Sequence, residues 1–477
     1  MGARELIAIL PIILISVSAV LAMLATAFIE SESAPAYISA TGFVISFISL
    51  FVAYPELPRA VTPLLIMDYF SYFYIGLIIL AGLAVSLLAY PDFKKRGIRQ
   101  GEFHVLLLLS VAGSATLAAS AHFASFLLGL EILSVSLYAM IAYDRPDIQG
   151  LEAGTKYLVL ASVSAAFLFF GMAMVYAGAG TMDLAGIAVN GIGGSISALA
   201  GIAMILVGIG FKLALVPFHM WTPDVYEGAP SPVTAFVASA SKGAVFALAL
   251  RYFTQAGIHD TGALAYVLLA VSIASMFIGN LLALLQDNLK RLLAYSSIAH
   301  LGYLLLLIAA GGRAAFIAGG YYLAAYFAAI IGAFGVISAL SAGRKEPRML
   351  GDIRGLAWES PWMAGFLSAM LLSLAGIPLT AGFIAKFYII SLGISKAMWW
   401  PVIMLIINSV IGLAYYLRVI AAVYERPQEA LFNATQNGVE AGKISLISGG
   451  VLAVLSAVTV ILGIYPPLLI KIIERTL

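Results

Sequence analysis

Long apolar stretches separated by short polar connections run along almost the whole chain. A helix needs about 20 mostly apolar residues to cross the hydrocarbon core of a membrane, and by this measure the sequence predicts about fourteen spans. Unpaired backbone groups are costly in lipid, and these runs are too long for barrel strands, so we expect an all-α polytopic membrane protein. The approximate bounds are 6–28, 36–54, 66–90, 102–120, 123–142, 154–177, 195–217, 230–252, 263–285, 289–310, 314–341, 361–392, 398–423 and 444–468.

Composition supports the same fold class. Hydrophobic residues make up 62% of the 477 and charged residues only 10%, whereas ordinary soluble domains carry about 25% charged residues. The basic residues are scattered and the net charge is +2, so nucleic acid is not an expected partner. The chain has no cysteine, which excludes disulfides, thiolate-bound clusters and a cysteine nucleophile. Its five histidines are dispersed and predict no metal site.

The basic residues of the connections predict the orientation. Under the positive-inside rule, the richer set lies on the inner side and both termini lie outside, in a multi-pass protein of the cell (inner or plasma) membrane. The inner set is Lys94, Lys95, Arg96, Arg99, Arg145, Lys290, Arg291, Arg344, Lys345, Arg348, Arg354, Arg426 and Lys443. The outer connections hold only Arg59, Arg251, Arg313 and Lys396, of which Arg251 and Arg313 are exceptions to the pattern. The stretch 6–28 is long enough to span and lacks a convincing cleavage site, so no signal peptide is expected.

A glycine-rich stretch, "GAGTMDLAGIAVNGIGG" (178–194), is the one loop that suggests nucleotide binding. No strand precedes it, and it lacks the glycine spacing of a dinucleotide fingerprint. We therefore expect a flexible outer loop.

A few ionisable residues lie within or beside the apolar spans. A cation at mid-bilayer costs roughly 2.5–3.5 kcal/mol even on a lenient scale, so these residues need a wet interior or partner charges. Those within spans are Glu131, Lys156, Lys212, Lys242, Lys386 and Arg418, and those near span ends or interruptions are His219, Lys290 and His300.

Several of these cations also have a structural interpretation. Lys156 lies near a span end and could extend to the interface, and Arg418 could form a structural pair. Lys290 could be an interfacial anchor at a helix start, with Asp287 as the expected cap that offsets its charge. The three deeper lysines, Lys212, Lys242 and Lys386, are harder to explain in this way, although static buried pairs remain an alternative.

Glu131, in "LLGLEILSVSLYAM", is the only acidic residue in the core of a span, and Ser134 lies one turn further on. A buried carboxylate beside a lysine stays ionised and favours the protonated lysine. A change in the influence of the glutamate would therefore load or release a lysine proton. This chemistry suits a line of lysines with one carboxylate.

Two spans contain helix breakers next to a lysine. Pro217 follows Lys212, and Pro378, with two glycines nearby, precedes Lys386. Proline removes a backbone donor and clashes with the preceding turn. Paired broken helices mark ion sites in transporters built from repeats, because the interruption frees backbone dipoles at membrane depth. We expect the two segments to be equivalent parts of two repeats.

Several long segments of the sequence resemble those of one known family. The segment "FKLALVPFHMWTPDVYEGAPSPVTAFVASASK" (211–242) closely resembles the signature of the subunit N family of respiratory complex I, which includes the mitochondrial second ND subunit. The segments "GLEILSVSLYAM" (129–140), "LLQDNLKRLLAYSSIAHLGY" (284–303), "SLAGIPLTAGFIAKF" (373–387) and "GLAYYLRV" (412–419) also match, in the expected order. The resemblance covers about residues 62 to 424.

The resemblance implies an antiporter-like fold of fourteen helices with two inverted five-helix repeats, each containing a discontinuous helix. The corresponding division is 1–100 for helices 1–3, 101–255 and 256–425 for the repeats, and 426–477 for helix 14. It implies that Glu131 pairs with Lys212 in the first half-channel, that Lys242 is the central lysine, and that Lys386 ends the second half-channel. The residues expected on the same polar axis with less certainty are Lys156, His219, Lys290, His300 and Tyr416.

The resemblance also implies partners. The chain itself would hold no redox centre, and NADH, FMN, iron–sulfur clusters and quinone would bind in other subunits. Its neighbours would be the other antiporter-like and small membrane-arm subunits, together with the lipid bilayer. The segment "TPDVYEGAP" distinguishes it from paralogues that read leucine-proline-aspartate-alanine there, and we expect this segment to carry little proton chemistry.

Three interpretations follow from these features. The first is a proton-translocating subunit of a complex I-type quinone oxidoreductase. The second is a stand-alone or Mrp-type cation/proton antiporter subunit, which the lysines alone also favour. The third is a silent membrane scaffold whose buried charges fix helix packing. The electron donor and the quinone type stay open.

Overall fold

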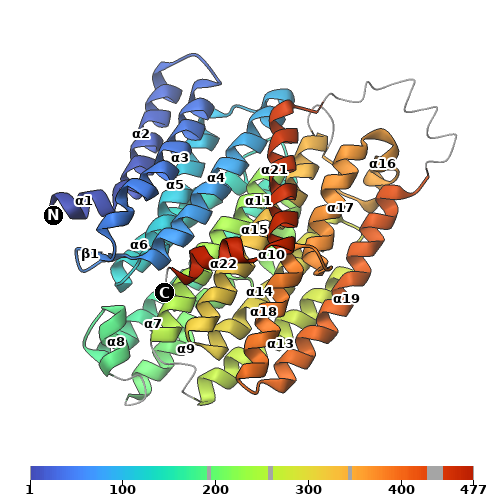
Figure 1. Cartoon of the computed structure of the whole chain (residues 1–477). Helices are drawn as coiled ribbons and strands as arrows, with labels where there is room; N and C mark the ends of the chain where they lie inside the picture. Colours follow the sequence, from blue (N-terminus) through green and yellow to red (C-terminus); the bar gives the residue numbers. More distant parts are fainter. Residues whose placement is uncertain (1, 191–194, 256–261, 342–345, 427–443, 476–477) are drawn as a thin grey trace.

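The computed structural model describes residues 2–190, 195–255, 262–341, 346–426 and 444–475 (Figure 1). Residues 191–194 of the glycine-rich stretch and the basic residues Arg344, Lys345 and Lys443 lie outside the described residues.

Helices account for nearly all of the described chain. The amino-terminal part contains α1 (Ala3–Ala8), α2 (Leu10–Phe28), α3 (Ala34–Ala53), the 3-10 turn η1 (Tyr54–Glu56), the strands β1 (Arg59–Val61) and β2 (Leu65–Met67), and α4 (Tyr69–Arg96). The middle contains α5 (Gly101–Ala118), α6 (Phe123–Ile141), α7 (Ile148–Ala179), α8 (Leu184–Asn190), α9 (Ile196–Lys212), α10 (Trp221–Gly228), α11 (Ser231–Phe236), the π-helical turn η3 (Val237–Ser241) and α12 (Lys242–Gln255).

The rest of the chain begins with α13 (Gly262–Leu284), α14 (Leu289–Ala310), α15 (Arg313–Ser341), the 3-10 turn η5 (Leu350–Ile353) and α16 (Leu356–Glu359). It continues with α17 (Pro361–Ala375), α18 (Ala381–Ser395), α19 (Trp399–Tyr424), α21 (Leu446–Ile464) and α22 (Pro467–Glu474).

The number of spans agrees with the sequence. Within the described residues, 12 helices are long and apolar enough to cross a membrane. The shorter apolar helices are α9, α17 and α18, which belong to the two segments predicted to be interrupted. Counting α9–α10 and α17–α18 as one broken span each gives the fourteen expected segments.

Two local predictions were incomplete. The described part of the glycine-rich stretch, expected to be a loop, continues α7 to Ala179 and then forms α8. Residues 59–67 form an antiparallel hairpin in which Arg59 pairs with Met67 and Val61 with Leu65, and its strands of three residues are too short for a periodicity to reveal. Ala121 and Leu64 join this hairpin to the end of α5 by a backbone hydrogen bond of 3.0 Å.

Long-range ion pairs bring several connections together at one end of the bundle, here called the basic end. Arg96, at the end of α4, pairs with Asp144 after α6. Arg348, after α15, pairs with Asp147 at the start of α7 over 2.7 Å. Which side of a membrane this end faces stays a prediction.

Two sets of five consecutive spans follow the same order along the chain. Spans α5, α6, α7, α9–α10 and α11–α12 are followed by spans α13, α14, α15, α17–α18 and α19, and the fourth span of each set is the broken one. The first set begins at the basic end. Because it contains an odd number of spans, the second set begins at the opposite end.

Glycines allow the first two helices of each half to touch backbone to backbone. A Cβ on Gly113 of α5 would lie 2.8 Å from the Gly129 oxygen of α6. A Cβ on Gly279 of α13 would lie 2.7 Å from the Ala299 nitrogen of α14. Small residues at membrane helix crossings permit such close approach, and the two halves use the same device.

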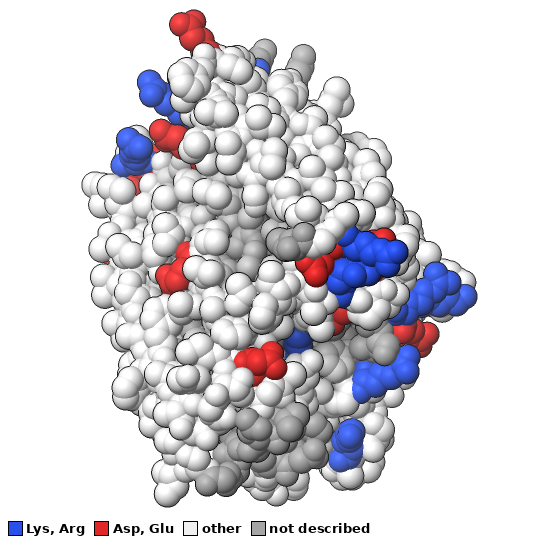
Figure 2. All heavy atoms as spheres, turned by 90° about the vertical axis from the view of Figure 1, so that its left-hand side faces the viewer, with Lys and Arg blue, Asp and Glu red and all other residues white. Residues whose placement is uncertain are grey.

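On the face in Figure 2, most of the surface is free of charged side chains. Large apolar side chains of α2 and α3, such as Val20, Ile45 and Phe51, are exposed. This surface is suited to lipid or to a neighbouring membrane protein.

Arg251, an exception to the orientation pattern, has a structural explanation. Its side chain is 5% exposed and pairs with Asp68, the residue that caps α4, over 2.7 Å. Its guanidinium also lies 4.6 Å from the centroid of the Phe70 ring. A paired and buried arginine does not contribute to the charge of a connection facing water.

The glycine crossings give a stability prediction. Replacing Gly279 by alanine places a methyl group against the backbone of α14, and overpacking of this kind costs about 1–3 kcal/mol. We expect Gly279→Ala to lower the thermal unfolding temperature in detergent. The matched control is Gly365→Ala on α17, where a Cβ meets nothing within 4 Å; equal unfolding temperatures for the two variants would contradict the proposed packing.

Candidate functional site

Lys212 is the last residue of α9, where the span breaks. The helix ends because Ala214 takes a left-handed conformation (φ 59°) and Pro217 has no backbone donor. The lysine is 7% exposed, and its Nζ donates a hydrogen bond to Ser134 Oγ of α6 over 2.7 Å. The Tyr157 ring lies 5.5 Å from the same nitrogen. The buried cation therefore has a hydroxyl acceptor and an aromatic face.

Glu131 lies one turn before Ser134 on α6. Its charge is near enough to Lys212 to interact with it, but among the described residues no direct ion pair joins the two. One carboxylate oxygen is buried without a hydrogen-bond partner. The pairing that the resemblance implies therefore stays a prediction, since the structure places Ser134 in direct contact with the lysine instead.

Lys242 is the first residue of α12 and follows a π-helical turn. It is 1% exposed, and its Nζ donates to Ser297 Oγ of α14 over 2.9 Å. The rings of Tyr226 and Trp221 lie 5.2 Å and 5.7 Å from the nitrogen. Single π-helical turns inside α-helices are frequent at functional sites.

Ser297 connects Lys242 to a buried tyrosine–histidine cluster. Tyr326 OH donates to Ser297 Oγ over 2.8 Å, and the Tyr326 ring centroid lies 5.2 Å from that of His300. His300 Nδ1 is 2.6 Å from Tyr322 OH, and its Nε2 is 3.2 Å from Tyr416 OH. The expected polar residues His300 and Tyr416 thus meet in the centre of the second half.

Lys386 lies on α18, after the second break. The chain between α17 and α18 contains Gly376 and Leu379, both with positive φ. The lysine is 7% exposed, and its Nζ donates to the carbonyl oxygen of Ala375, at the end of α17, over 2.8 Å. The Tyr303 ring is 5.3 Å from this nitrogen, and its centroid is 5.6 Å from that of His300.

A continuous series of polar and aromatic contacts therefore joins Lys242 to Lys386 by way of Ser297, Tyr326, His300 and Tyr303.

Between Lys212 and Lys242 the contacts are aromatic. The Tyr157 and Trp221 rings are 4.9 Å apart, and Trp221 Nε1 donates to the Phe211 carbonyl over 2.9 Å. Trp221 thus lies between the two lysines, since its ring contacts Tyr157, the neighbour of Lys212, and also lies beside Lys242. His219 is buried nearby, with Nδ1 lacking a hydrogen-bond partner, and no described contact joins it to Lys242.

Lys156 is on the outside of this core. Its side chain is 44% exposed and pairs with Glu152 over 2.7 Å and with Asp224 over 2.8 Å. Asp224 of α10 also accepts from Arg291 of α14 over 2.8 Å, and Glu227 accepts from the same arginine over 2.9 Å. Lys156 therefore belongs to an ion-pair network that links the two halves.

This network adds a structural role to one segment singled out in the sequence. The segment "TPDVYEGAP" was expected mainly to distinguish paralogues, yet its Asp224 and Glu227 anchor α10 to both halves. In the sequence, the only indication of these ion pairs was two acidic residues three positions apart beside a broken span. Arg291, their partner, is 67 residues from Asp224 along the chain, so no local pattern reveals the pairing.

Lys290 is neither an interfacial anchor nor offset by Asp287. It is fully buried, and its Nζ pairs with Glu346 over 3.0 Å. Asn288, not Asp287, caps α14, because its side chain accepts from the backbone nitrogens of Lys290 and Arg291. Arg418, interpreted as a structural pair, bonds to the Gln286 carbonyl and lies 3.8 Å from Asp287.

Cofactor-binding residues are not evident. Within the described ranges, no three His, Asp or Glu side chains are grouped as they would be to hold a metal ion. The buried lysines, hydroxyls and imidazole described above are groups that can donate or accept protons.

The α10 network gives a prediction about stability. Asp224 accepts hydrogen bonds from Lys156 and Arg291, each over 2.8 Å. We expect Asp224→Asn to lower the free energy of unfolding by about 1 kcal/mol at neutral pH, because the variant removes the negative charge that both cations face.

Unfolding of the two proteins in denaturant at neutral pH measures this effect. Glu102→Gln is the control, since Glu102 lies in an exposed 3.8 Å pair with Arg145. Equal free energies of unfolding for the two variants would contradict a stabilising role of the network.

Comparison with known proteins identifies relatives of the chain. A family model described as NADH:quinone oxidoreductase/Mrp antiporter, transmembrane, matches residues 120–412. The chain is 48% identical over 487 residues to NADH-quinone oxidoreductase subunit N from Nitrosospira multiformis, covering 98% of this chain and 96% of that protein.

Solved structures of related membrane complexes have the same fold. A chain of respiratory complex I from Thermus thermophilus with bound aureothin has a TM-score of 0.80 and 29% identity, covering 97% of this chain and 98% of that one. The Mrp complex from Dietzia sp. DQ12-45-1b gives a TM-score of 0.88 at 21% identity, covering 100% of this chain and 97% of that one, and therefore shows the fold alone. The chain belongs to the NADH:quinone oxidoreductase/Mrp antiporter family of membrane proteins, and its resemblance to subunit N of complex I is confirmed.

Proposed function

We propose that the chain translocates protons as a membrane-arm subunit of a complex I-type NADH-quinone oxidoreductase. The observation that carries this proposal is the buried series of contacts from Lys242 through Ser297 and His300 to Lys386. Ionisable residues inside a membrane protein are costly and mark ion or proton pathways.

The three deep lysines, Lys212, Lys242 and Lys386, here called the axis, would each hold a proton in turn. Lys212, with Glu131 one turn from its hydroxyl partner, would load the first half-channel, and Lys242 would connect the halves. Lys386, at the second break, would release the proton. Because the direct acceptors of these lysines are neutral oxygens, no carboxylate holds the proton in place. His219 and Tyr416 would assist transfer on either side of Lys242.

The energy for this cycle would come from partner subunits. NADH, FMN, iron–sulfur clusters and quinone would be bound there, and this chain would hold no redox centre of its own. The neighbouring antiporter-like and small membrane subunits would cover parts of the exposed apolar surface. Redox energy would then reach the axis as a change in the field around Glu131.

We also propose that 101–255 and 256–425 are two inverted repeats, preceded by helices of 1–100 and followed by 426–477. The shared position of the broken span and the matched glycine crossings support this division. With the basic end on the inner side, both termini lie outside.

An Mrp-type cation/proton antiporter subunit is the second candidate. The TM-score of 0.88 to a chain of the Mrp complex favours a common fold. The 48% identity over nearly the full length to an oxidoreductase subunit favours the first candidate.

The central test removes one axis lysine at a time. We expect Lys212→Met, Lys242→Met and Lys386→Met each to reduce proton translocation by at least about tenfold in the purified complex, because a proton-accepting group is lost. Proton uptake by proteoliposomes, measured with the donor oxidation rate, checks this outcome. Lys396→Met is the matched control, since Lys396 is exposed in the connection between α18 and α19.

A normal proton-to-electron ratio in the assembled Lys212→Met and Lys386→Met complexes would overturn the proposal. The scaffold interpretation makes the opposite prediction, in which assembly fails but whatever assembles pumps normally. Sodium-driven pH changes in liposomes that contain this chain alone would favour the antiporter.

A further inference from the structure

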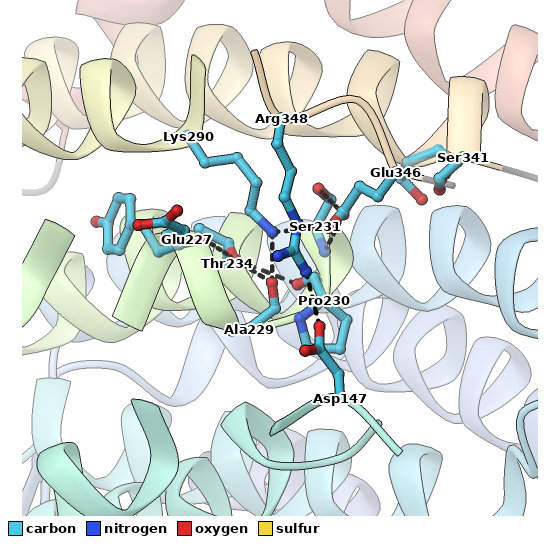
Figure 3. Close-up of polar contacts among 12 residues, drawn as sticks. Asp147, Glu227, Ala229, Pro230, Ser231, Thr234, Lys290, Ser341, Glu346 and Arg348 are labelled. Atoms are coloured by element: carbon cyan, nitrogen blue, oxygen red, sulfur yellow. Dashed lines mark hydrogen bonds and ion pairs between the residues drawn. The ribbon is translucent and has the colours of Figure 1, made fainter. Parts of the chain in front are cut away.

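A buried ion pair at the basic end lies outside the axis described above (Figure 3). Lys290 Nζ, in the first turn of α14, is 3.0 Å from Glu346 Oε2 and donates to the Ala229 carbonyl oxygen over 2.6 Å. The lysine side chain is 0% exposed, while the Glu346 side chain is 8% exposed. Glu346 therefore stands between this buried ammonium group and the surface at the basic end.

Glu346 is also bonded to the helix that carries Lys242. The Ser231 backbone nitrogen donates to Glu346 Oε1 over 3.0 Å, and Ser231 Oγ donates to the same oxygen. Ser231 is the first residue of α11, which continues through η3 into α12 and Lys242. A carboxylate at this position is favoured by the positive end of the helix dipole.

Other charged groups pack around the pair from four sides. From α4 come Asp92, which accepts from Ser338 and Ser341, and Arg96, which pairs with Asp144. Arg348 follows Glu346 and pairs with Asp147 from the α6–α7 connection, and Arg291 of α14 binds Asp224 and Glu227. Among the described neighbours, Glu346 is the carboxylate bonded to Lys290.

The pair leads toward the centre of the axis. Lys290 and Ser297 are seven residues apart on α14, two helical turns and about 10 Å along one face. On the facing segment, Thr234 Oγ1 lies 3.4 Å from the Ala229 oxygen and 3.3 Å from the Tyr226 oxygen. Tyr226 OH is 3.2 Å from Ser297 Oγ, which accepts from Lys242. Polar groups thus extend from Lys290 to the Tyr226 backbone and from Tyr226 OH to Lys242, with the Tyr226 ring between the two sections.

We propose that Glu346 is the proton entry residue of the basic end, and that it passes protons from the aqueous phase to Lys290 and so to Lys242. This inference rests on the proposed function. Lys290 in its ammonium form gives a proton to the axis and becomes a neutral amine. Glu346 then takes one proton from water and transfers it to that amine. The carboxylate and the ammonium group are restored, and one proton has moved inward.

The charge balance of the pair supports this order of steps. Burial acts to raise the pKa of Glu346, but the charge of Lys290 and the hydrogen bond from Ser231 outweigh it, and the pKa lies below its ordinary value. At rest the carboxylate is therefore ionised. When Lys290 loses its proton, the main charge that lowers the pKa disappears, and Glu346 becomes able to take up a proton.

Two substitutions separate proton transfer from a structural ion pair. Lys290→Arg keeps the positive charge and a donor for Glu346, but a guanidinium does not release its proton. Glu346→Gln keeps acceptor and donor atoms near Ser231 but does not titrate. In the purified complex reconstituted in liposomes, we expect each to slow proton translocation by at least about tenfold, since transfer at this step becomes limiting. Asp147→Asn, which breaks the neighbouring pair with Arg348, is the control and should translocate normally.

The outcomes are distinct. Normal translocation by an assembled Lys290→Arg complex would overturn the inference, because a structural pair tolerates arginine and a proton relay does not. If Glu346→Gln does not assemble, Lys290→Arg alone decides, and partial recovery in Glu346→Asp supports the relay. If the Met variants of Lys212, Lys242 and Lys386 also translocate normally, the proposed function fails as well. Loss in those variants with normal Lys290→Arg overturns only the entry site.

Discussion

The structure depends on how buried ammonium groups are stabilised at membrane depth. Lys212, Lys242 and Lys386 are between 1% and 7% exposed, and each has one neutral oxygen acceptor and at least one aromatic ring. Lys156 and Lys290, by contrast, are paired directly with carboxylates. A carboxylate partner favours the protonated lysine, whereas hydroxyls and carbonyls hold the cation without fixing its proton. The neutral partners therefore distinguish Lys212, Lys242 and Lys386 from Lys156 and Lys290, which a carboxylate helps to keep protonated at rest.

Irregular backbone supplies part of this environment. The break after α17 leaves the Ala375 carbonyl free to accept from Lys386, and the break after α9 ends the helix at Lys212. A third irregular segment, the π-helical turn η3, directly precedes Lys242. Non-helical backbone at membrane depth is tolerated where protein surrounds it, and here buried aromatic rings and α14 provide that surrounding. On α14, Ser297 bonds to Lys242 of the first half, while Ser296 and His300 bond to Tyr416 and Tyr322 of the second half. One regular helix therefore contacts both halves.

Features local in sequence could be predicted, and contacts between distant segments could not. Apolar length gave the fourteen spans, and proline beside a lysine located both breaks. Asp287 was the wrong cap because the neighbouring Asn288 has the geometry to accept two backbone donors. The pair of Lys290 and Glu346 joins residues 56 positions apart, and Glu346 lies in a connection without periodicity. Direct contact of Lys212 with Ser134 instead of Glu131 depends on how α6 and α9 pack, which no single segment determines.

We propose that protons pass from Lys242 to Lys386 through side-chain contacts across α14, and that the charges alone are insufficient. Ser297→Ala tests this most directly, because it removes one hydroxyl shared by Lys242, Tyr226 and Tyr326 and leaves every charge in place. The measurement is the proton-to-electron ratio of the assembled complex in proteoliposomes, with Ser272→Ala of α13 as control. We expect a lower ratio for Ser297→Ala alone. An unchanged ratio in a fully assembled complex would contradict it.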